Sequence, residues 1–382
     1  YNTKPIKKTM ARSKKICILT QPLWHNYGCL LQAYALQKCL KAMNYEVVTD
    51  EYPRRFLSFF DKLKDKSKRV IAYHILGRKT VNPNPFYPNE KSWKEICKNT
   101  SRFIKERIDT VDFFNGQTLP SKEMINNFDT FIIGSDQVWR DSYGKVESYF
   151  GDFLQTEDKK IFSYAASFGL STWQFDIERT EKLKKLVKKF RSISVREKDA
   201  VELCRDNLNI EAKWVLDPTM LLSKEDYIGL FKDYSQEKSE GDLMTYILDS
   251  SEEKISLIKL VETEKKLSSF TVMAKENETF PAVEKWLKGF YDAKFILTDS
   301  FHGMVFSIIF EKPFLVVLNK QRGATRFLSL LSALGLEDRL IEGIEDFNTN
   351  LLKRDIDYET IRKKLFALID KSKAFLIDSL EK

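Results

Sequence analysis

The sequence predicts an α/β fold made of two domains, each built around a parallel sheet, that face a cleft. Short apolar runs typical of strands alternate with helical runs, and this alternation starts again after a polar stretch at 232–242. Polar residues also follow the ends of the strand-like runs. The chain has 382 residues, which suits two domains of ordinary size.

The first domain is predicted to span residues 15–222. It opens with a strand at 15–21, a helix within 28–45 and a strand at 46–52, a unit that predicts parallel strand pairing. The stretch 127–139 is predicted to be a strand followed by a Gly-Ser-Asp turn, and further strands are predicted at 159–169, 192–197 and 213–218. An amphipathic helix over 181–192 has an apolar face that consists of Leu183, Leu186, Val187 and Phe190. We expect residues 1–14 to be a disordered basic leader and 53–120 to be a basic, aromatic insertion.

The second domain is predicted over 243–345, after a linker at 223–242. Its expected strands are 243–250, 268–274, 294–300 and 313–319, with helices between them. A helical segment at 346–382 completes the predicted organisation. The restart of the strand–helix pattern therefore indicates two α/β units of similar construction.

Composition and cysteine usage narrow the class of protein. Lys and Arg outnumber Asp and Glu by 63 to 55, which favours anionic ligands, but the excess is spread too evenly for nucleic-acid binding. The five cysteines include no C-x-x-C pair, and neither a signal peptide nor a membrane-spanning run is predicted, so we expect a cytoplasmic protein. The basic, aromatic stretch 54–79 is either a solvated insertion or a peripheral contact with the inner face of the cell membrane.

Several common site motifs are missing from the sequence. The sequence contains no G-x-G-x-x-G, no G-x-x-x-x-G-K-[ST] and no G-x-S-x-G. It therefore does not predict dinucleotide binding, a P-loop or the nucleophile elbow of an α/β-hydrolase. His25 and Cys29 lie four residues apart without companion ligands, and we predict no metal site.

Candidate site residues cluster where the predicted strands end. Ligands of parallel α/β domains bind outside the carboxyl ends of the strands. The candidates at these ends are His25, Asn26, Gly28, Ser135, Asp136, Gln137, Ser167, Arg196, Ser300 and His302.

Each main candidate also has a structural interpretation. His25, Asp136 or His302 could cap a helix, and Arg196 could pair with a neighbouring acidic residue. Asp217, which precedes Pro218, is typical of a turn. The coincidence of so many polar residues at strand ends nevertheless favours a site between the domains.

Six segments in order carry a resemblance to a known family: NYGCLLQAYALQ, IIGSDQVW, SYAASFG, SVREKDA, VLDPTMLL and TDSFHGMVFSIIFEKPF. Together they resemble the polysaccharide pyruvyl transferase family over residues 15–335. The resemblance implies two Rossmann-like domains arranged as in glycosyltransferase B enzymes. It also implies transfer of the pyruvyl unit of phosphoenolpyruvate (PEP) onto a sugar of a cell-surface polysaccharide or its lipid-linked precursor. A cyclic ketal would form and phosphate would leave, with PEP as donor substrate and no cofactor.

The resemblance also implies roles for individual residues. Asp136, Arg196 and His302 correspond to the catalytic positions, and histidine can act as acid or base near neutral pH. Better-studied relatives have Arg-Leu-His where this sequence has Ser300-Phe301-His302. One cation is therefore missing from the expected phosphate site, and Arg322 or Arg326 could supply it.

Two other functions remain open at this stage. The predicted fold also suits a glycosyltransferase of polysaccharide biosynthesis that uses a nucleotide-sugar donor. The change at Ser300 leaves room for a non-catalytic relative that only binds saccharides. Dependence on PEP separates the first alternative from pyruvyl transfer, and phosphate release separates the second.

Overall fold

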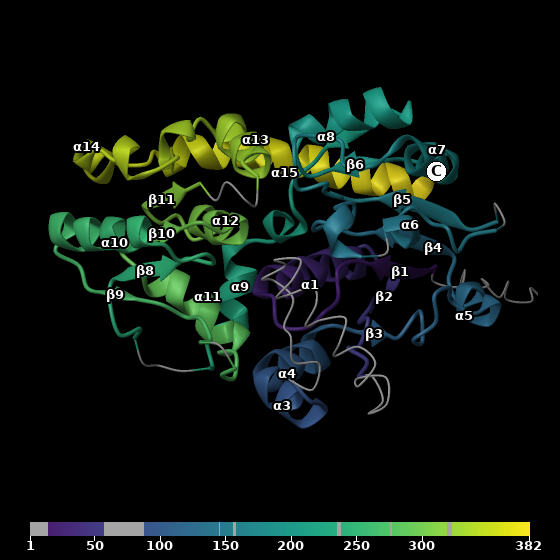
Figure 1. Cartoon of the computed structure of the whole chain (residues 1–382), viewed down its shortest axis with the longest axis horizontal. Helices are drawn as coiled ribbons and strands as arrows, with labels where there is room; N and C mark the ends of the chain where they lie inside the picture. Colours follow the sequence, from purple (N-terminus) through teal and green to yellow (C-terminus); the bar gives the residue numbers. More distant parts are fainter. Residues whose placement is uncertain are drawn as a thin grey trace, which may run out of the picture.

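The protein consists of two α/β units, each organised around its own five-stranded sheet (Figure 1). A computed structural model describes residues 14–56, 88–144, 146–155, 158–234, 238–275, 277–318 and 323–382. The sheet orders are β3-β2-β1-β4-β5 and β12-β11-β10-β8-β9, and every pair of neighbouring strands in them is parallel. The predicted α/β class with two Rossmann-like units is confirmed.

The strands are short, and most end at or before the predicted limits. In the first unit they are β1 (Lys15–Leu19), β2 (Glu46–Asp50), β3 (Thr110–Val111), β4 (Thr130–Ile133), β5 (Lys160–Ser163), β6 (Ser194–Val195) and β7 (Lys213–Trp214). In the second unit they are β8 (Leu243–Tyr246), β9 (Ser269–Phe270), β10 (Phe295–Thr298), β11 (Phe314–Val317) and β12 (Leu340–Ile341). The residues after each strand leave the hydrogen-bonded ladder and form the loops that carry the site candidates.

The helices lie between these strands in the chain. They are α1 (Tyr27–Ala42), α3 (Glu90–Ile96), α4 (Lys98–Arg107), α5 (Lys122–Asn126), α6 (Val146–Tyr149), α7 (Ile177–Val187), α8 (Lys198–Leu203), α9 (Lys224–Phe231), α10 (Glu252–Lys265), α11 (Val283–Asp292), α12 (Phe301–Ile309), α13 (Thr325–Leu334), α14 (Thr349–Lys353) and α15 (Tyr358–Glu381). The predicted apolar residues pack together, since Leu183 and Val187 are buried and Leu186 and Phe190 pack against the same cluster, but α7 starts and ends earlier than the predicted 181–192 and Phe190 lies beyond its end.

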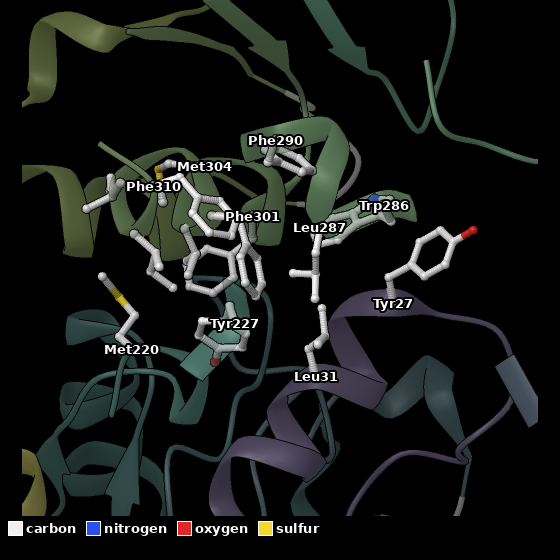
Figure 2. Close-up of a cluster of buried hydrophobic side chains, with 14 of the residues drawn as sticks. Tyr27, Leu31, Met220, Tyr227, Trp286, Leu287, Phe290, Phe301, Met304 and Phe310 are labelled. Atoms are coloured by element: carbon white, nitrogen blue, oxygen red, sulfur yellow. The ribbon is translucent and has the colours of Figure 1, made fainter. Parts of the chain in front are cut away.

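A continuous apolar core joins the two units (Figure 2). Tyr27 and Leu31 of α1 face Trp286 and Leu287 of α11, and the rings of Tyr27 and Trp286 stack with centroids 5.4 Å apart. The Tyr27 hydroxyl also donates to the carbonyl of Pro281 at 2.8 Å. Burying a side chain of this size contributes roughly 1.5–3 kcal/mol. The position of one unit on the other is therefore held by the core itself.

Helix α15 crosses from the second unit to the first (Figure 1). Ile361, near its start, belongs to the core cluster that joins the two units, whereas Phe375 and Leu376 pack with Ile16 and Ile18 of β1. The last turns of α15 thus pack on the sheet of the first unit, although they lie at the other end of the described sequence.

Parts of the predicted organisation differ from the structure or fall outside the described residues. Within the predicted linker, α9 is an ordered helix with a capping box at Ser223, and its Tyr227 is fully buried. The second half of the predicted insertion supplies α3, α4 and β3, while 57–87 and 1–13 lie outside the described residues. All five cysteines are buried and free. No helix of the described residues is long and apolar enough to cross a bilayer.

Candidate functional site

The candidate residues surround a cavity of about 250 Å³ between the two units. The loop after β1, the loop after β4 and the junction of β10 with α12 all contribute to its wall, so it lies at the carboxyl ends of strands in both sheets. Eight predicted residues line it: His25, Asn26, Gly28, Asp136, Gln137, Ser300, His302 and Arg326. The structure therefore gathers most of the predicted candidates into one site.

His302 lies in the first turn of α12 and presses against α1. Ser300 caps this helix by accepting from the backbone N–H of Gly303 at 3.3 Å, so His302 itself is not the cap. A methyl group at Gly28 would lie only 2.0 Å from His302 Nδ1. Gly28 is thus the residue that lets the imidazole sit against α1.

Asp217 connects His302 to the rest of the site. Its Oδ2 lies 3.5 Å from His302 Nε2, and it accepts hydrogen bonds from Arg196 Nη1 at 2.8 Å and from the Ser135 hydroxyl at 3.2 Å. Burial alone would raise the pKa of Asp217, but the charges of His302 and Arg196 hold that pKa well below its usual value. Asp217 is therefore an ionised carboxylate placed between the histidine and the arginine.

Arg196 is buried and extends the same network to Asp136. It is only 3% exposed, and its Nη2 donates to Asp136 Oδ1 at 3.3 Å. Burial opposes its charge, yet Asp217 and Asp136 outweigh that effect and keep the pKa of Arg196 above its ordinary value. Asp136 has a φ of +74°, a left-handed conformation that is uncommon outside glycine and is often kept at functional sites.

The ring of Phe301 lies near both Arg196 and a second arginine, Arg326. The guanidinium carbon of Arg196 lies 4.8 Å from the centroid of the Phe301 ring, and that of Arg326 lies 5.7 Å from it. Ser329 of α13 accepts from the backbone N–H of Lys198, which holds the helix carrying Arg326 against the segment after β6. Burial and then repulsion from Arg196 lower the pKa of Arg326 to about 10, so both guanidinium groups are charged at neutral pH. Arg326 therefore places a charged guanidinium at the cavity wall, whereas both Nη groups of Arg196 are already used on Asp217 and Asp136 behind it.

A sequence profile of the polysaccharide pyruvyl transferase family matches residues 26–321, which is most of the chain. This chain belongs to that family. No curated protein matches the transferase at a significant level.

Several solved structures are similar to this chain at low sequence identity. UDP-GlcNAc 2-epimerase from Neisseria meningitidis, bound to UDP-GlcNAc, is 10% identical, covers 96% of this chain and 99% of its own, and has a TM-score of 0.45. S. aureus MnaA with UDP is 13% identical, with coverage of 94% and 91% and a TM-score of 0.41. Spinosyn rhamnosyltransferase SpnG with thymidine diphosphate is 11% identical, with coverage of 96% and 100% and a TM-score of 0.41.

Arg196 and two predicted serines of the transferase lie behind the cavity. The Ser135 hydroxyl donates a hydrogen bond to Asp217 at 3.2 Å, and the Ser167 hydroxyl donates one to Glu197 at 2.9 Å. Neither serine is part of the cavity wall formed by the described residues. Both serines are better described as supports for the charged groups in front of them, and Arg322 falls outside the described residues.

The cap and pairing alternatives are partly resolved. Asn26, and not His25, caps α1 by accepting from the backbone N–H of Cys29 at 3.2 Å. His25 instead packs against Phe280 with ring centroids 4.4 Å apart, and burial followed by the charge of Arg54 lowers its pKa. The carboxylate of Asp136 accepts from the backbone N–H of Gln137 in a turn.

Asp217 is the main site residue that the sequence interpretation treated as structural. It does cap the short 3₁₀ turn Pro218–Leu221, where it accepts from the backbone N–H and hydroxyl of Thr219. The turn explains only half of this carboxylate. Its Oδ1 accepts from Thr219 in the turn, and its Oδ2 accepts from Arg196 and Ser135 in the site. Among the described residues, no group of three or more His, Cys, Asp and Glu side chains is arranged to hold a metal ion.

Proposed function

We propose that this transferase moves the pyruvyl unit of PEP onto two hydroxyls of a saccharide acceptor and releases phosphate. The observation that carries the proposal is the buried cation Arg326 at the wall of the cavity that His302 also lines, where His302 Nε2 faces Asp217. Family membership supports transfer chemistry in polysaccharide biosynthesis.

The donor calls for a cation, and Arg326 supplies one at the cavity wall. PEP carries a phosphate and a carboxylate, and each group calls for a cation that donates hydrogen bonds. Arg326 takes the place of the arginine that relatives have at the position of Ser300. A cavity of about 250 Å³ lies below the usual range for drug-sized ligands, which favours a three-carbon donor.

The reaction requires two protons to move. The acceptor loses one proton from each of its two hydroxyls. One proton goes to the PEP methylene carbon, which becomes a methyl group as the first hydroxyl oxygen bonds to C2. The second leaves with phosphate when the second hydroxyl oxygen displaces it from C2. The atoms and charges balance without a further reactant.

His302 is placed to exchange these protons. Its Nε2 faces the Asp217 carboxylate, and its Nδ1 faces Gly28 at the cavity wall. We assign proton exchange to Nδ1, while Asp217 fixes the orientation of the ring, as a carboxylate does in acid–base triads. Asp136 orients the acceptor or takes its hydroxyl proton, and Arg196 holds the Asp136 carboxylate in place.

The first experiment measures the thermal unfolding midpoint with and without millimolar PEP, beside a panel of nucleotide sugars. A ligand present at about 100 times its Kd stabilises the fold by about 2.7 kcal/mol, which is on the order of a few degrees here. We expect PEP to raise the midpoint in the wild type and Arg326→Gln to weaken PEP binding about tenfold or more. Arg205→Gln is the matched control, since Arg205 is exposed and pairs with Asp206.

Phosphate release in the presence of an acceptor tests the chemistry. We expect His302→Gln to bind PEP but to release no phosphate. A midpoint that rises with a nucleotide sugar and not with PEP would instead support a glycosyltransferase. PEP binding with phosphate release unchanged in His302→Gln would remove the proposed role of the histidine.

A further inference from the structure

His25 lies at the wall of the catalytic cavity, and its ring nitrogens are not used by the fold. It sits in the loop between β1 and α1, directly before Asn26, which caps α1. Its Nδ1 is buried, and within the part of the chain that the structure describes no hydrogen bond reaches the imidazole. Polar atoms inside proteins almost always have a partner, so an imidazole without one beside a cavity indicates a role toward a ligand.

Two aromatic rings hold the imidazole of His25 in place. The ring of Phe280, from the second unit, lies 4.4 Å away between centroids, and Trp93 of α3 packs against the imidazole edge-on at 5.3 Å. Phe280 is itself fixed, because its backbone N–H donates to the carbonyl of Ile96 at 2.9 Å and its carbonyl accepts from Asn99 Nδ2 at 2.9 Å. The imidazole is therefore positioned at the boundary between the units by ring contacts alone.

The surroundings favour the neutral form of this imidazole. Burial, and after it the positive charge of Arg54, lower the pKa of His25 from its ordinary value. At neutral pH the ring is then mostly uncharged, and a neutral imidazole has one nitrogen that can accept a proton. Asp136, the other candidate base, has its Oδ1 engaged by the N–H of Gln137 at 2.9 Å and by Arg196 Nη2 at 3.3 Å, which favours an orienting role.

The proposed reaction needs an acid and a base at the same time. In its first step a proton must reach the PEP methylene carbon while the attacking hydroxyl loses its own proton. One imidazole cannot give and take a proton in the same step. His25 and His302 line the same cavity, one from each unit, so the site contains two separate imidazoles for these two tasks.

We propose that His25 is a second catalytic residue, which accepts the proton of the attacking acceptor hydroxyl at Nε2, because Nδ1 is buried. The inference rests on the proposed function, since it assigns a step of that reaction. In the first step the hydroxyl oxygen bonds to C2, its proton passes to His25, and His302 gives a proton to the methylene carbon.

The second step returns both histidines to their starting states. The other hydroxyl gives its proton to His302 as its oxygen bonds to C2. The bond between C2 and the phosphate oxygen breaks with its electron pair on the phosphate, which takes the proton from His25. No further reactant is needed, because the two histidines exchange the roles of acid and base between the steps.

The test measures PEP-dependent phosphate release by the wild type, His25→Gln and His25→Ala. The acceptor probes are the methyl glycosides of glucose, galactose and mannose, and N-acetylglucosamine 1-phosphate. The probe on which the wild type releases phosphate is used for the variants, and Arg205→Gln is the control, since Arg205 is exposed and pairs with Asp206. The unfolding midpoint with and without PEP shows that each variant folds and binds the donor. His25→Ala is assayed again with imidazole, 4-methylimidazole and 4-bromoimidazole, which differ in basicity.

We expect kcat to fall about 100-fold or more in both His25 variants, while PEP still raises the midpoint. Glutamine can hold a hydroxyl but cannot take its proton, so a rise in acceptor KM at unchanged kcat in His25→Gln would reduce the residue to a binding role and overturn the proposal. Added imidazoles should restore turnover of His25→Ala in the order of their basicity, and restoration that ignores basicity would also overturn it. Absence of phosphate release by the wild type itself would count against the proposed reaction, so the two failures are distinct.

Discussion

Replacing Gly28 with alanine should inactivate the transferase without unfolding it. The added methyl group would lie 2.0 Å from His302 Nδ1, where ordinary contact begins at 3.4 Å, so the ring must move by about 1.4 Å. The imidazole cannot keep its place between Gly28 and Asp217 after such a move.

The expected size of the effect follows from that displacement. A misplacement of about 1 Å at reacting groups can reduce turnover about 100-fold. Alanine also favours a helix over glycine by roughly 0.5–1 kcal/mol, which partly offsets the cost of the crowding. We therefore expect kcat to fall at least about 100-fold while the unfolding midpoint changes by only a few degrees.

The assay measures PEP-dependent phosphate release together with thermal unfolding. Gly229→Ala is the matched control, because Gly229 also lies in a helix but a methyl group there meets nothing within 4 Å. We expect this control to retain activity and to be as stable as the wild type or slightly more stable. If Gly28→Ala had the kcat of the wild type, the absence of a side chain at position 28 would not be needed to place His302.

Three further predictions follow. Asp217→Asn removes one of the two carboxylates that pair with the buried charge of Arg196 and should cost about 3–5 kcal/mol in urea unfolding at neutral pH; an unchanged midpoint would contradict the network. Burial raises the pKa of Asp50 to about 7, so its ionisation should reduce stability by on the order of 4 kcal/mol as pH rises from about 4 to 8. Asp50→Asn should remove that loss, and equal pH profiles for both proteins would exclude it. Phe301→Leu removes the ring shared with Arg326 and should raise the KM for PEP several-fold at unchanged acceptor KM; a change in acceptor KM alone would argue against a donor role.

The linkage sign is opposite for the two aspartates. Asp217 has a lowered pKa, so its contribution to stability is present above about pH 4 and is lost as pH falls towards its folded pKa. Asp50 has a raised pKa, so it weakens the fold as pH rises. Measuring Asp217→Asn and Asp50→Asn over the same pH range separates these two contributions.

Much of the site was predictable because parallel α/β folds place ligands at the carboxyl ends of strands. His302, Asp136 and Arg196 were found by following each apolar run to its end. The packed helix α9 was missed because the polar stretch after it is typical of a linker, although Tyr227 is buried in the core.

The sequence by itself determined the α/β alternation, the restart that marks the second unit and the order of motifs that identifies the family. These features are encoded locally, in the period of apolar residues and in the residues at strand ends. Only the tertiary structure decided that Asp217 meets His302 and that Gly28 makes room for the imidazole. Those contacts join residues far apart in the chain, and they depend on how α1, α12 and the turn at Pro218–Leu221 pack against one another, which no local pattern specifies.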